Sequence, residues 1–252
     1  MKKFISFSGG VESTAMCVLF GNVADALFSD TGFEHQQIYD RIDLVEKWVQ
    51  NFHRKDFKIH RVKNKTYLSL KTYIVQAKFY PSFKSRYCTR MFKIEPIDDF
   101  LEQFKDEGVE LMIGLNAEEI EQRTGNHGNK SFVNYSYPLA DKGITRNACK
   151  VILIGAGLLP QFPVYMQRGG CVGCYYKSKK EYEAMALLSP KEFEEVEHIE
   201  ESIQDRRAEI FSILPGITMH QIKLNVSNML FKPDEIYAVI NDATKCGVFC
   251  NR

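Results

Sequence analysis

The sequence has no apolar run of membrane-spanning length, no internal repeat, no low-complexity tract and almost no net charge. Its 33 lysines and arginines nearly balance 32 aspartates and glutamates, so the formal net charge is +1. This gives no global electrostatic case for binding nucleic acid, although a local patch such as Lys84, Arg86, Arg90 and Lys93 remains. The first residues lead straight into a strand pattern and lack the form of a secretory signal. We therefore expect a soluble, cytoplasmic protein that does not enter a membrane.

Strand and helix patterns alternate through the first half of the chain. Apolar strands are predicted at residues 4–7, 24–29, 57–62 and 111–114, with apolar residues at helical spacing between them. This alternation is typical of an α/β fold in which helices flank a parallel sheet. Beyond residue 170 the pattern becomes charged and helical. With 252 residues, the chain is long enough for one core with a small, mostly helical appendage.

Residues 8–14 have the form of a phosphate-binding loop. They read Ser-Gly-Gly-Val-Glu-Ser-Thr, after an apolar strand pattern and before an apolar helical run. Two glycines let the backbone approach an anion closely, and the first N–H groups of the helix would face its oxygens. Ser13 and Thr14 would add hydroxyl donors. The spacing matches neither the dinucleotide nor the Walker pattern, and the alternative is an ordinary glycine-rich turn capped by Ser8 or Ser13.

A second turn, Asp30-Thr31-Gly32, follows the second predicted strand. Ligands of parallel sheets bind where the strands end, so this turn and the loop would lie at one edge. Asp30 would hydrogen-bond a ribose or an adenine there. The alternative is that the three residues form only a turn.

The seven cysteines favour metal ligands, redox groups or core residues over a disulfide framework. Cys171 and Cys174 form a C-x-x-C after two glycines, a turn that presents two thiolates to one metal. Iron-sulfur, zinc and thiol redox chemistry are the alternatives for this pair. Cys17 falls on the apolar face of the first helix, and we expect it in the core.

Five segments resemble, in order and spacing, the phosphoadenosine-phosphosulfate (PAPS) reductase family of the PP-loop ATP pyrophosphatase superfamily. Residues 8–14 are similar to its S-G-G-x-D-S loop, with Glu12 at the usual Asp. Residues 86–97 resemble its C-C-x-x-x-K-x-x-P-L segment, with Thr89 at the second cysteine. Residues 114–123 resemble G-I-R-x-D-E-S-x-x-R, with Asn116 at the first Arg. The remaining two are residues 137–145 and the C-x-x-C module at 170–181.

The resemblance implies an adenine-nucleotide-binding PP-loop domain at 1–165 and a helical, metal-binding segment at 166–252. It implies that Lys93 and Glu12 act in catalysis, Lys93 as a point charge for phosphate or sulfate. The implied nucleotide-binding residues are Ser8, Gly9, Gly10, Glu12, Ser13, Thr14, Asp30, Gly114 and Arg123. The nucleotide is ATP with Mg²⁺, or one of the sulfonucleotides adenosine phosphosulfate (APS) and PAPS.

The resemblance also implies a metal centre. Cys88 would join Cys171 and Cys174 around a 4Fe-4S cluster, with zinc as the rival metal. The fourth ligand would be Cys250, Cys246 or Cys149, or one iron would stay open to bind sulfur.

Three functions follow as alternatives. In the first, the loop cleaves ATP between the α and β phosphates and adenylates an acceptor, which then receives sulfur from a sulfur donor. In the second, the enzyme reduces APS or PAPS to sulfite with a thiol reductant. Cys246 is then the nucleophile, because residues 245–249 faintly resemble the family's E-C-G-L-H tail. In the third, a zinc-stabilised module binds a nucleotide or nucleic acid without chemistry. Nucleic acid is one candidate acceptor, and a homodimer is one assembly that the sequence allows.

Overall fold

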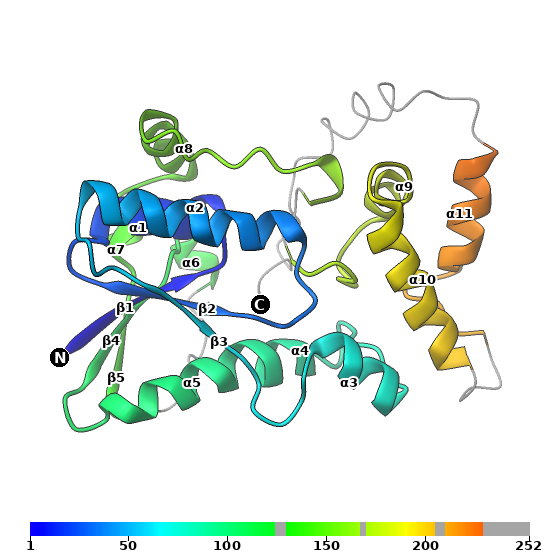
Figure 1. The fold of residues 1–252 in the computed structure, drawn as a ribbon, viewed down its shortest axis with the longest axis horizontal. Helices are drawn as coiled ribbons and strands as arrows, with labels where there is room; N and C mark the ends of the chain where they lie inside the picture. Colours follow the sequence, from blue (N-terminus) through cyan, green and yellow to red (C-terminus); the bar gives the residue numbers. More distant parts are fainter. Residues whose placement is uncertain (124–129, 167–169, 205–209, 229–252) are drawn as a thin grey trace.

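A five-stranded parallel sheet forms the centre of the computed structural model, which describes residues 1–123, 130–166, 170–204 and 210–228 (Figure 1). The strand order is β3-β2-β1-β4-β5, and every neighbouring pair is parallel. The strands are β1 (Lys2–Phe7), β2 (Asp25–Ser29), β3 (Ile59–Val62), β4 (Val109–Met112) and β5 (Val133–Ser136). The predicted α/β fold is confirmed. The edge strand β5 was not predicted, because only Val133 of its four residues is buried and the apolar signal is correspondingly weak.

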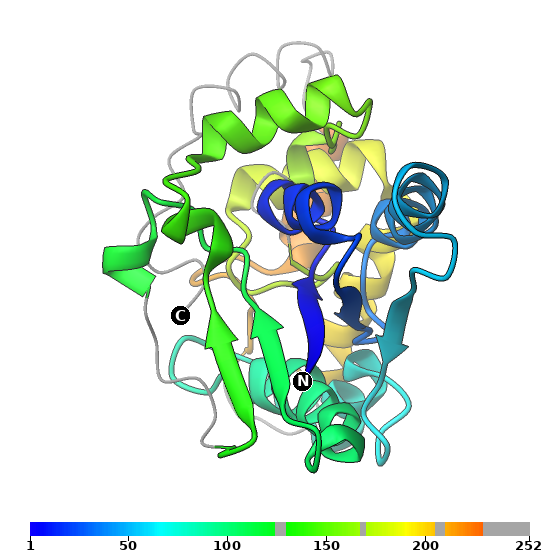
Figure 2. The same cartoon turned by 90° about the vertical axis from the view of Figure 1, so that its left-hand side faces the viewer.

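Helices cover both faces of the sheet. Figures 1 and 2 show α1, α2 and α8 over one face and α5 along the other, with α9, α10 and α11 beside the sheet. The long helices are α1 (Val11–Phe20), α2 (Gln36–Phe52), α3 (Leu70–Ala77), α8 (Arg146–Gly155), α9 (Lys179–Leu188), α10 (Pro190–Gln204) and α11 (Met219–Ser227). The short ones are α4 (Tyr87–Thr89), η1 (Arg90–Ile94), α5 (Glu95–Leu101), η2 (Glu102–Phe104), α6 (Ile120–Arg123), α7 (Pro138–Asp141) and η3 (Val164–Met166). In the described ranges, no helix combines the length and apolar character that crossing a membrane needs.

The main hydrophobic core continues from the sheet into the C-terminal helices. Ile5 and Phe28 of the sheet belong to the same buried cluster as Tyr182, Phe193 and Ile222 of α9, α10 and α11. A smaller cluster lies between the other face of the sheet and α5, around Phe4, Leu101 and Val109. The C-terminal helices therefore share their apolar contacts with the sheet and with the helices of the N-terminal half.

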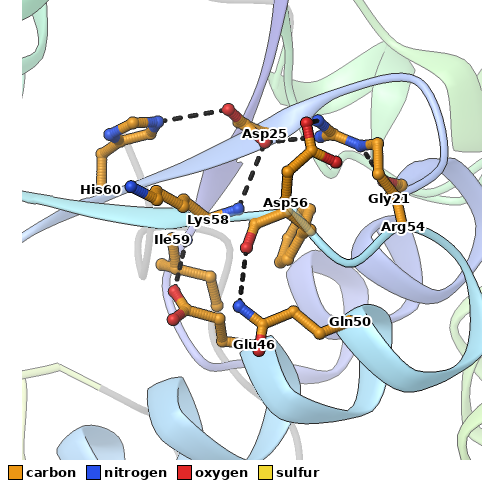
Figure 3. Close-up of polar contacts among 10 residues, drawn as sticks. Gly21, Asp25, Glu46, Gln50, Arg54, Asp56, Lys58, Ile59 and His60 are labelled. Carbon is orange, nitrogen blue, oxygen red and sulfur yellow. Dashed lines mark hydrogen bonds and ion pairs between the residues drawn. The ribbon is translucent and has the colours of Figure 1, made fainter.

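A polar network fixes the amino ends of β2 and β3 (Figure 3). Asp25 accepts hydrogen bonds from Arg54, from His60 and from the backbone N–H of Lys58. Two side chains of α2 bond to the backbone next to it, since Glu46 accepts from the Ile59 N–H and Gln50 donates to the Phe57 carbonyl. These contacts anchor α2 to β3 at the end of the sheet opposite the predicted ligand edge.

Candidate functional site

The loop after β1 is shaped to hold an anion at the start of α1. Gly9 has φ +77°, a left-handed conformation that disfavours a side chain, and a Cβ there would lie 3.3 Å from Ile38 Cδ1. Ser13 Oγ accepts from the Ser8 N–H at 3.2 Å and donates to the Gly10 carbonyl at 3.3 Å. The N-cap is Gly10, which offers no side-chain bond to α1, so neither Ser8 nor Ser13 caps the helix. Because the first-turn N–H groups lack intrahelical partners, they are available to phosphate oxygens.

A buried arginine holds the loop from behind. Arg41 of α2 donates to the Gly9 carbonyl at 2.9 Å, to Thr14 Oγ1 at 3.0 Å and to the Leu158 carbonyl at 3.0 Å. Burial lowers the pKa of Arg41 to about 10, so it remains charged at neutral pH. Thr14 is fully buried and engaged by this guanidinium. The Thr14 hydroxyl, predicted as a donor to the ligand, therefore binds Arg41 in the interior and does not face solvent.

Glu12 is held at the mouth of the loop by residues from two other elements. Its Oε1 accepts hydrogen bonds from Arg146 Nη1 and, at 3.3 Å, from Asn116 Nδ2. Gly114 lies against the same turn, since a Cβ there would approach the Ser13 nitrogen to 3.4 Å. The structure thus brings Gly114 and Asn116, which follow β4, to the first turn of α1. The Arg146 guanidinium therefore lies beside the Glu12 carboxylate, at the position where the loop of the resembling family has Asp.

The turn after β2 carries Asp30 at the same edge. Asp30 accepts from Tyr39 Oη at 2.7 Å and from the Gly32 N–H at 2.8 Å, and it forms an ion pair with Lys63. Burial alone raises the pKa of Asp30, but these three partners outweigh it and hold the pKa below its usual range. Thr31 then donates to Glu34 Oε1 at 2.8 Å. Asp30 is an ionised, ordered acceptor whose partners come from its own turn, from α2 and from the segment after β3.

The C-x-x-C turn lies against this segment. The Val172 N–H donates to the Phe33 carbonyl at 2.9 Å, and a Cβ at Gly173 would overlap the Phe33 ring and the Tyr80 hydroxyl. Gly170 has φ +91°, and a Cβ there would lie 3.2 Å from Cys174 Sγ. Close packing therefore requires a glycine immediately before each of the two cysteines. This places the C-x-x-C turn at the same edge of the sheet as Asp30.

The three thiols predicted as metal ligands lie in one neighbourhood. Cys171 donates a hydrogen bond to Cys174, which lowers the pKa of Cys174 and raises that of Cys171. Burial raises the pKa of Cys88, and the negative charge on Cys174 adds to this. All three keep partly exposed surface. In the described ranges, however, these three sulfurs do not form a group in which each lies within 4.8 Å of the other two.

Two lysines balance the charge of these thiols. Lys93 of η1 is exposed, and Glu34 first and then Cys171, Cys174 and Cys88 raise its pKa. Lys177 is buried, donates to the Tyr165 carbonyl at 2.6 Å, and has its pKa lowered by burial against the pull of Cys174. Both cations favour the thiolate form of Cys174, the one thiol of the three whose pKa is lowered, and a thiolate is the form that binds metals and attacks electrophiles.

A buried histidine adjoins the same segment. His35 is fully buried and donates from Nδ1 to Glu192 at 2.8 Å, and burial lowers its pKa in spite of that carboxylate. Its Nε2 has no partner in the described part of the chain. The contact joins the segment after β2 to α10, and so fixes the C-terminal helices beside the thiols.

Other predicted residues are placed elsewhere or not described. Cys149 of α8 is buried, and the charges that act on it belong to Glu12, Arg146 and Glu118, so it lies beside the loop. Arg123 is the last residue of α6, but its side chain is not among those that the structure describes. Cys246 and Cys250 lie outside the described residues. Cys17 is fully buried in the core, as predicted.

Sequence reasoning gave no role to four residues of this site: Arg41, Arg146, His35 and Lys177. Arg41 sits within a helix whose apolar residues alternate with charges, and nothing local marks one arginine as buried. Arg146 follows the helix cap Thr145, where a basic residue opposes the helix dipole, and this unfavourable position was the one available signal.

Comparisons with known proteins include two relatives by sequence and one solved structure. Two uncharacterized proteins of Methanocaldococcus jannaschii are 27% identical over 120 residues and 30% identical over 103 residues, or 46% and 40% of this chain. The match covers 23% of each relative's own length. The crystal structure of PAPS reductase from Candida auris in a phosphate complex aligns with 64% of this chain and 74% of that one, at 14% identity and a TM-score of 0.47.

The family comparison covers the loop and the strands that carry it. The model of the phosphoadenosine phosphosulfate reductase domain matches residues 2–127, which is half of the chain. The matched span includes β1 to β4, the loop at 8–14, Lys93 and Cys88. The chain therefore belongs to the phosphoadenosine phosphosulfate reductase domain family.

Proposed function

We propose that this protein is an enzyme that binds ATP at residues 8–14, cleaves it between the α and β phosphates, and uses the resulting adenylate for sulfur transfer. The observation that carries the proposal is the uncapped N-terminus of α1 behind a left-handed Gly9. Such a terminus offers several N–H donors and a positive dipole end to one phosphate group. Arg41 keeps this loop rigid, so that little ordering is needed when the nucleotide binds.

The proposed step balances without a redox partner. An oxygen of the acceptor attacks the α-phosphorus and forms a P–O bond, while the bond from the α-phosphorus to the bridging oxygen breaks and pyrophosphate leaves. A sulfur nucleophile then displaces AMP from the acceptor carbon. The protein contributes positioning and charge neutralisation: the loop N–H groups and Ser13 would bind the phosphates, and Glu12 would hold Mg²⁺.

The thiols support an iron-sulfur centre for the sulfur step. Cys88, Cys171 and Cys174 form a soft donor set, and Lys93 and Lys177 offset its negative charge. A single zinc ion with bonds of about 2.3 Å needs thiolates about 4 Å apart. A cluster of four irons takes its thiolates around a larger body, so it does not require all three sulfurs to lie within 4.8 Å of one another. Such a centre supplies sulfur binding at iron when one ligand position is open.

A sulfonucleotide reductase is the second candidate, because the chain belongs to a family named for that activity. The exposed cation of Lys93 beside the thiols would bind the sulfate or phosphate of APS or PAPS. Cys246 would attack the sulfur and a thiol reductant would release sulfite.

Parallel calorimetric titrations with ATP, APS and PAPS separate the candidates. We expect ATP with Mg²⁺ to bind, and pyrophosphate release from ATP to be lost in Ser13→Ala. Ser227→Ala removes an exposed hydroxyl from α11 and is the matched control. Tighter binding of PAPS, with sulfite release that depends on Cys246, would replace the proposal with the second candidate.

Metal analysis of anaerobically purified protein tests the cluster. We expect iron and acid-labile sulfide in the wild type and their loss in Cys174→Ser, whereas Cys17→Ala in the core retains both. Zinc without iron, together with no nucleotide binding, would make the protein a non-catalytic module.

A further inference from the structure

The positive charge of this nearly neutral chain is concentrated in one segment. Residues 57–94 hold ten of the 33 lysines and arginines and none of the 32 aspartates and glutamates. The rest of the chain therefore carries 23 basic residues against 32 acidic ones. The same segment contains eight of the 31 aromatic residues. Basic residues interleaved with aromatic ones are the composition that single-stranded nucleic acid binding requires.

Three cations of the segment that have no ion pair in the described part of the chain lie near its end, and Lys58 at its start also has none. Five of its basic residues form ion pairs with acidic residues elsewhere: Arg61, Lys63, Lys65, Lys71 and Arg90. Lys84, Arg86 and Lys93 form no ion pair with any residue that the structure describes. Lys84 is exposed, and Arg86 is held with its guanidinium 5.8 Å from the ring of Tyr176. The charge available to a partner is thus close to Cys88.

Aromatic rings stand beside these cations. Phe83 is 65% exposed. Its ring packs edge to face against those of Tyr175 and Tyr176, with centroid distances of 5.3 and 4.8 Å. The ring centroids of Tyr175 and Tyr176 lie 4.4 Å apart, and the two residues directly follow Cys174 in the sequence. Because both tyrosines support Phe83, its ring is held outward with little freedom to lose on binding. An exposed, supported ring next to unpaired cations is a stacking platform for a base whose phosphates meet the cations.

We propose that residues 79–90 together with Tyr175 and Tyr176, the aromatic-basic surface, bind an unpaired stretch of RNA. A ring can stack on a base only when that base is not paired, and loops of RNA present such bases routinely. Cys88 belongs to this surface and Cys174 adjoins it, so a base held on Phe83 would lie next to the thiols. The binding goes beyond the proposed function and needs neither ATP hydrolysis nor a metal centre.

Fluorescence anisotropy with the full chain tests the surface. The probe is a labelled single-stranded RNA of about 12 nucleotides, within the range that such platforms cover. We expect Phe83→Ala to raise the Kd about tenfold, which is the loss of one stacked base. Phe52→Ala removes an equally exposed ring from α2 and should leave the Kd unchanged.

Salt dependence tests the cations separately. Lys84→Ala removes one phosphate contact, so the slope of log Kd against log salt should fall by about 0.7. Lys58→Ala is the matched control, because Lys58 is an exposed lysine of the same segment at the opposite end of the sheet. Equal binding by wild type and Phe83→Ala, no binding of the RNA, or tighter binding of single-stranded DNA of the same sequence would each overturn the proposal. The outcome does not depend on pyrophosphate release, so the surface and the proposed function fail separately.

Discussion

At the scale of the residue, Gly9 connects backbone conformation to ligand binding. We expect Gly9→Ala to cost about 1 kcal/mol of stability from its left-handed φ, and to weaken ATP binding because the new Cβ presses on Ile38. Gly157→Ala has a similar φ of +68° with nothing within 4 Å, so it should lose stability alone. Thermal unfolding and calorimetric titration of both variants measure the two effects. Equal ATP affinity in the two variants would contradict the role of Gly9.

Arg41 stabilises the loop through three carbonyl or hydroxyl acceptors. Arg41→Met keeps the apolar stem but leaves the Gly9 and Leu158 carbonyls and the Thr14 hydroxyl without this donor. We expect the free energy of unfolding to fall by about 3 kcal/mol. Chemical denaturation measures it, and a loss below about 1 kcal/mol would mean that water replaces the guanidinium.

The glycine loop could be predicted from sequence, whereas its support could not. Ser8 to Thr14 carry local conformational and hydrogen-bonding preferences that a linear motif records. Arg41 and Arg146 lie 32 and 134 residues along the chain from the loop residues that they contact. Tertiary packing alone creates these contacts, so no local pattern records them. Glu12 was predicted as a ligand, but its pairing with Arg146 needed three dimensions.

At the scale of the element, the Asp25 network couples β2, β3 and α2 to pH (Figure 3). Burial opposes ionisation of Asp25, but hydrogen bonds from His60, Arg54 and the Lys58 N–H outweigh it and lower the pKa. A lowered carboxyl pKa stabilises the fold above the unfolded value near 3.9, and this stability is lost as pH falls through the folded pKa.

We therefore expect Asp25→Asn to be less stable than the wild type at pH 7 and the difference to shrink below about pH 4. Denaturation of both proteins across this range measures it, with Asp106→Asn as the control, since the Asp106 side chain is exposed and lies outside this network. A difference that stays constant with pH would mean that the carboxylate charge contributes nothing.

Element prediction succeeded where apolar periodicity was strong and failed where tertiary contacts replace it. β2 could be predicted because it buries four of its five residues, and burial of this extent requires the apolar run that the sequence shows. β5 buries one residue of four and is a strand because Val133 to Ser136 pair with β4. The thiol turn was recognised from Cys171 and Cys174, but its packing on Phe33 was not foreseen.

At the scale of the whole molecule, one core joins both halves of the chain. Phe193 of α10 is 1% exposed and belongs to the same cluster as the sheet residues and the α2 residue Val45. His35 and Glu192 add a polar contact between the halves. Shared burial of this kind predicts cooperative unfolding in a single transition.

The single tryptophan makes this cooperativity measurable. Trp48 lies in α2, with its ring centroid 4.9 Å from that of Phe52, so its fluorescence reports on the half of the molecule that carries residues 8–14. We expect Phe193→Ala to cost 3–5 kcal/mol, as is typical of a buried phenylalanine. It should lower the midpoint of the Trp48 transition by about 10 °C, together with that of the circular dichroism signal. If the C-terminal helices formed an independent unit, the Trp48 midpoint would stay at its wild-type value while the helical signal moved.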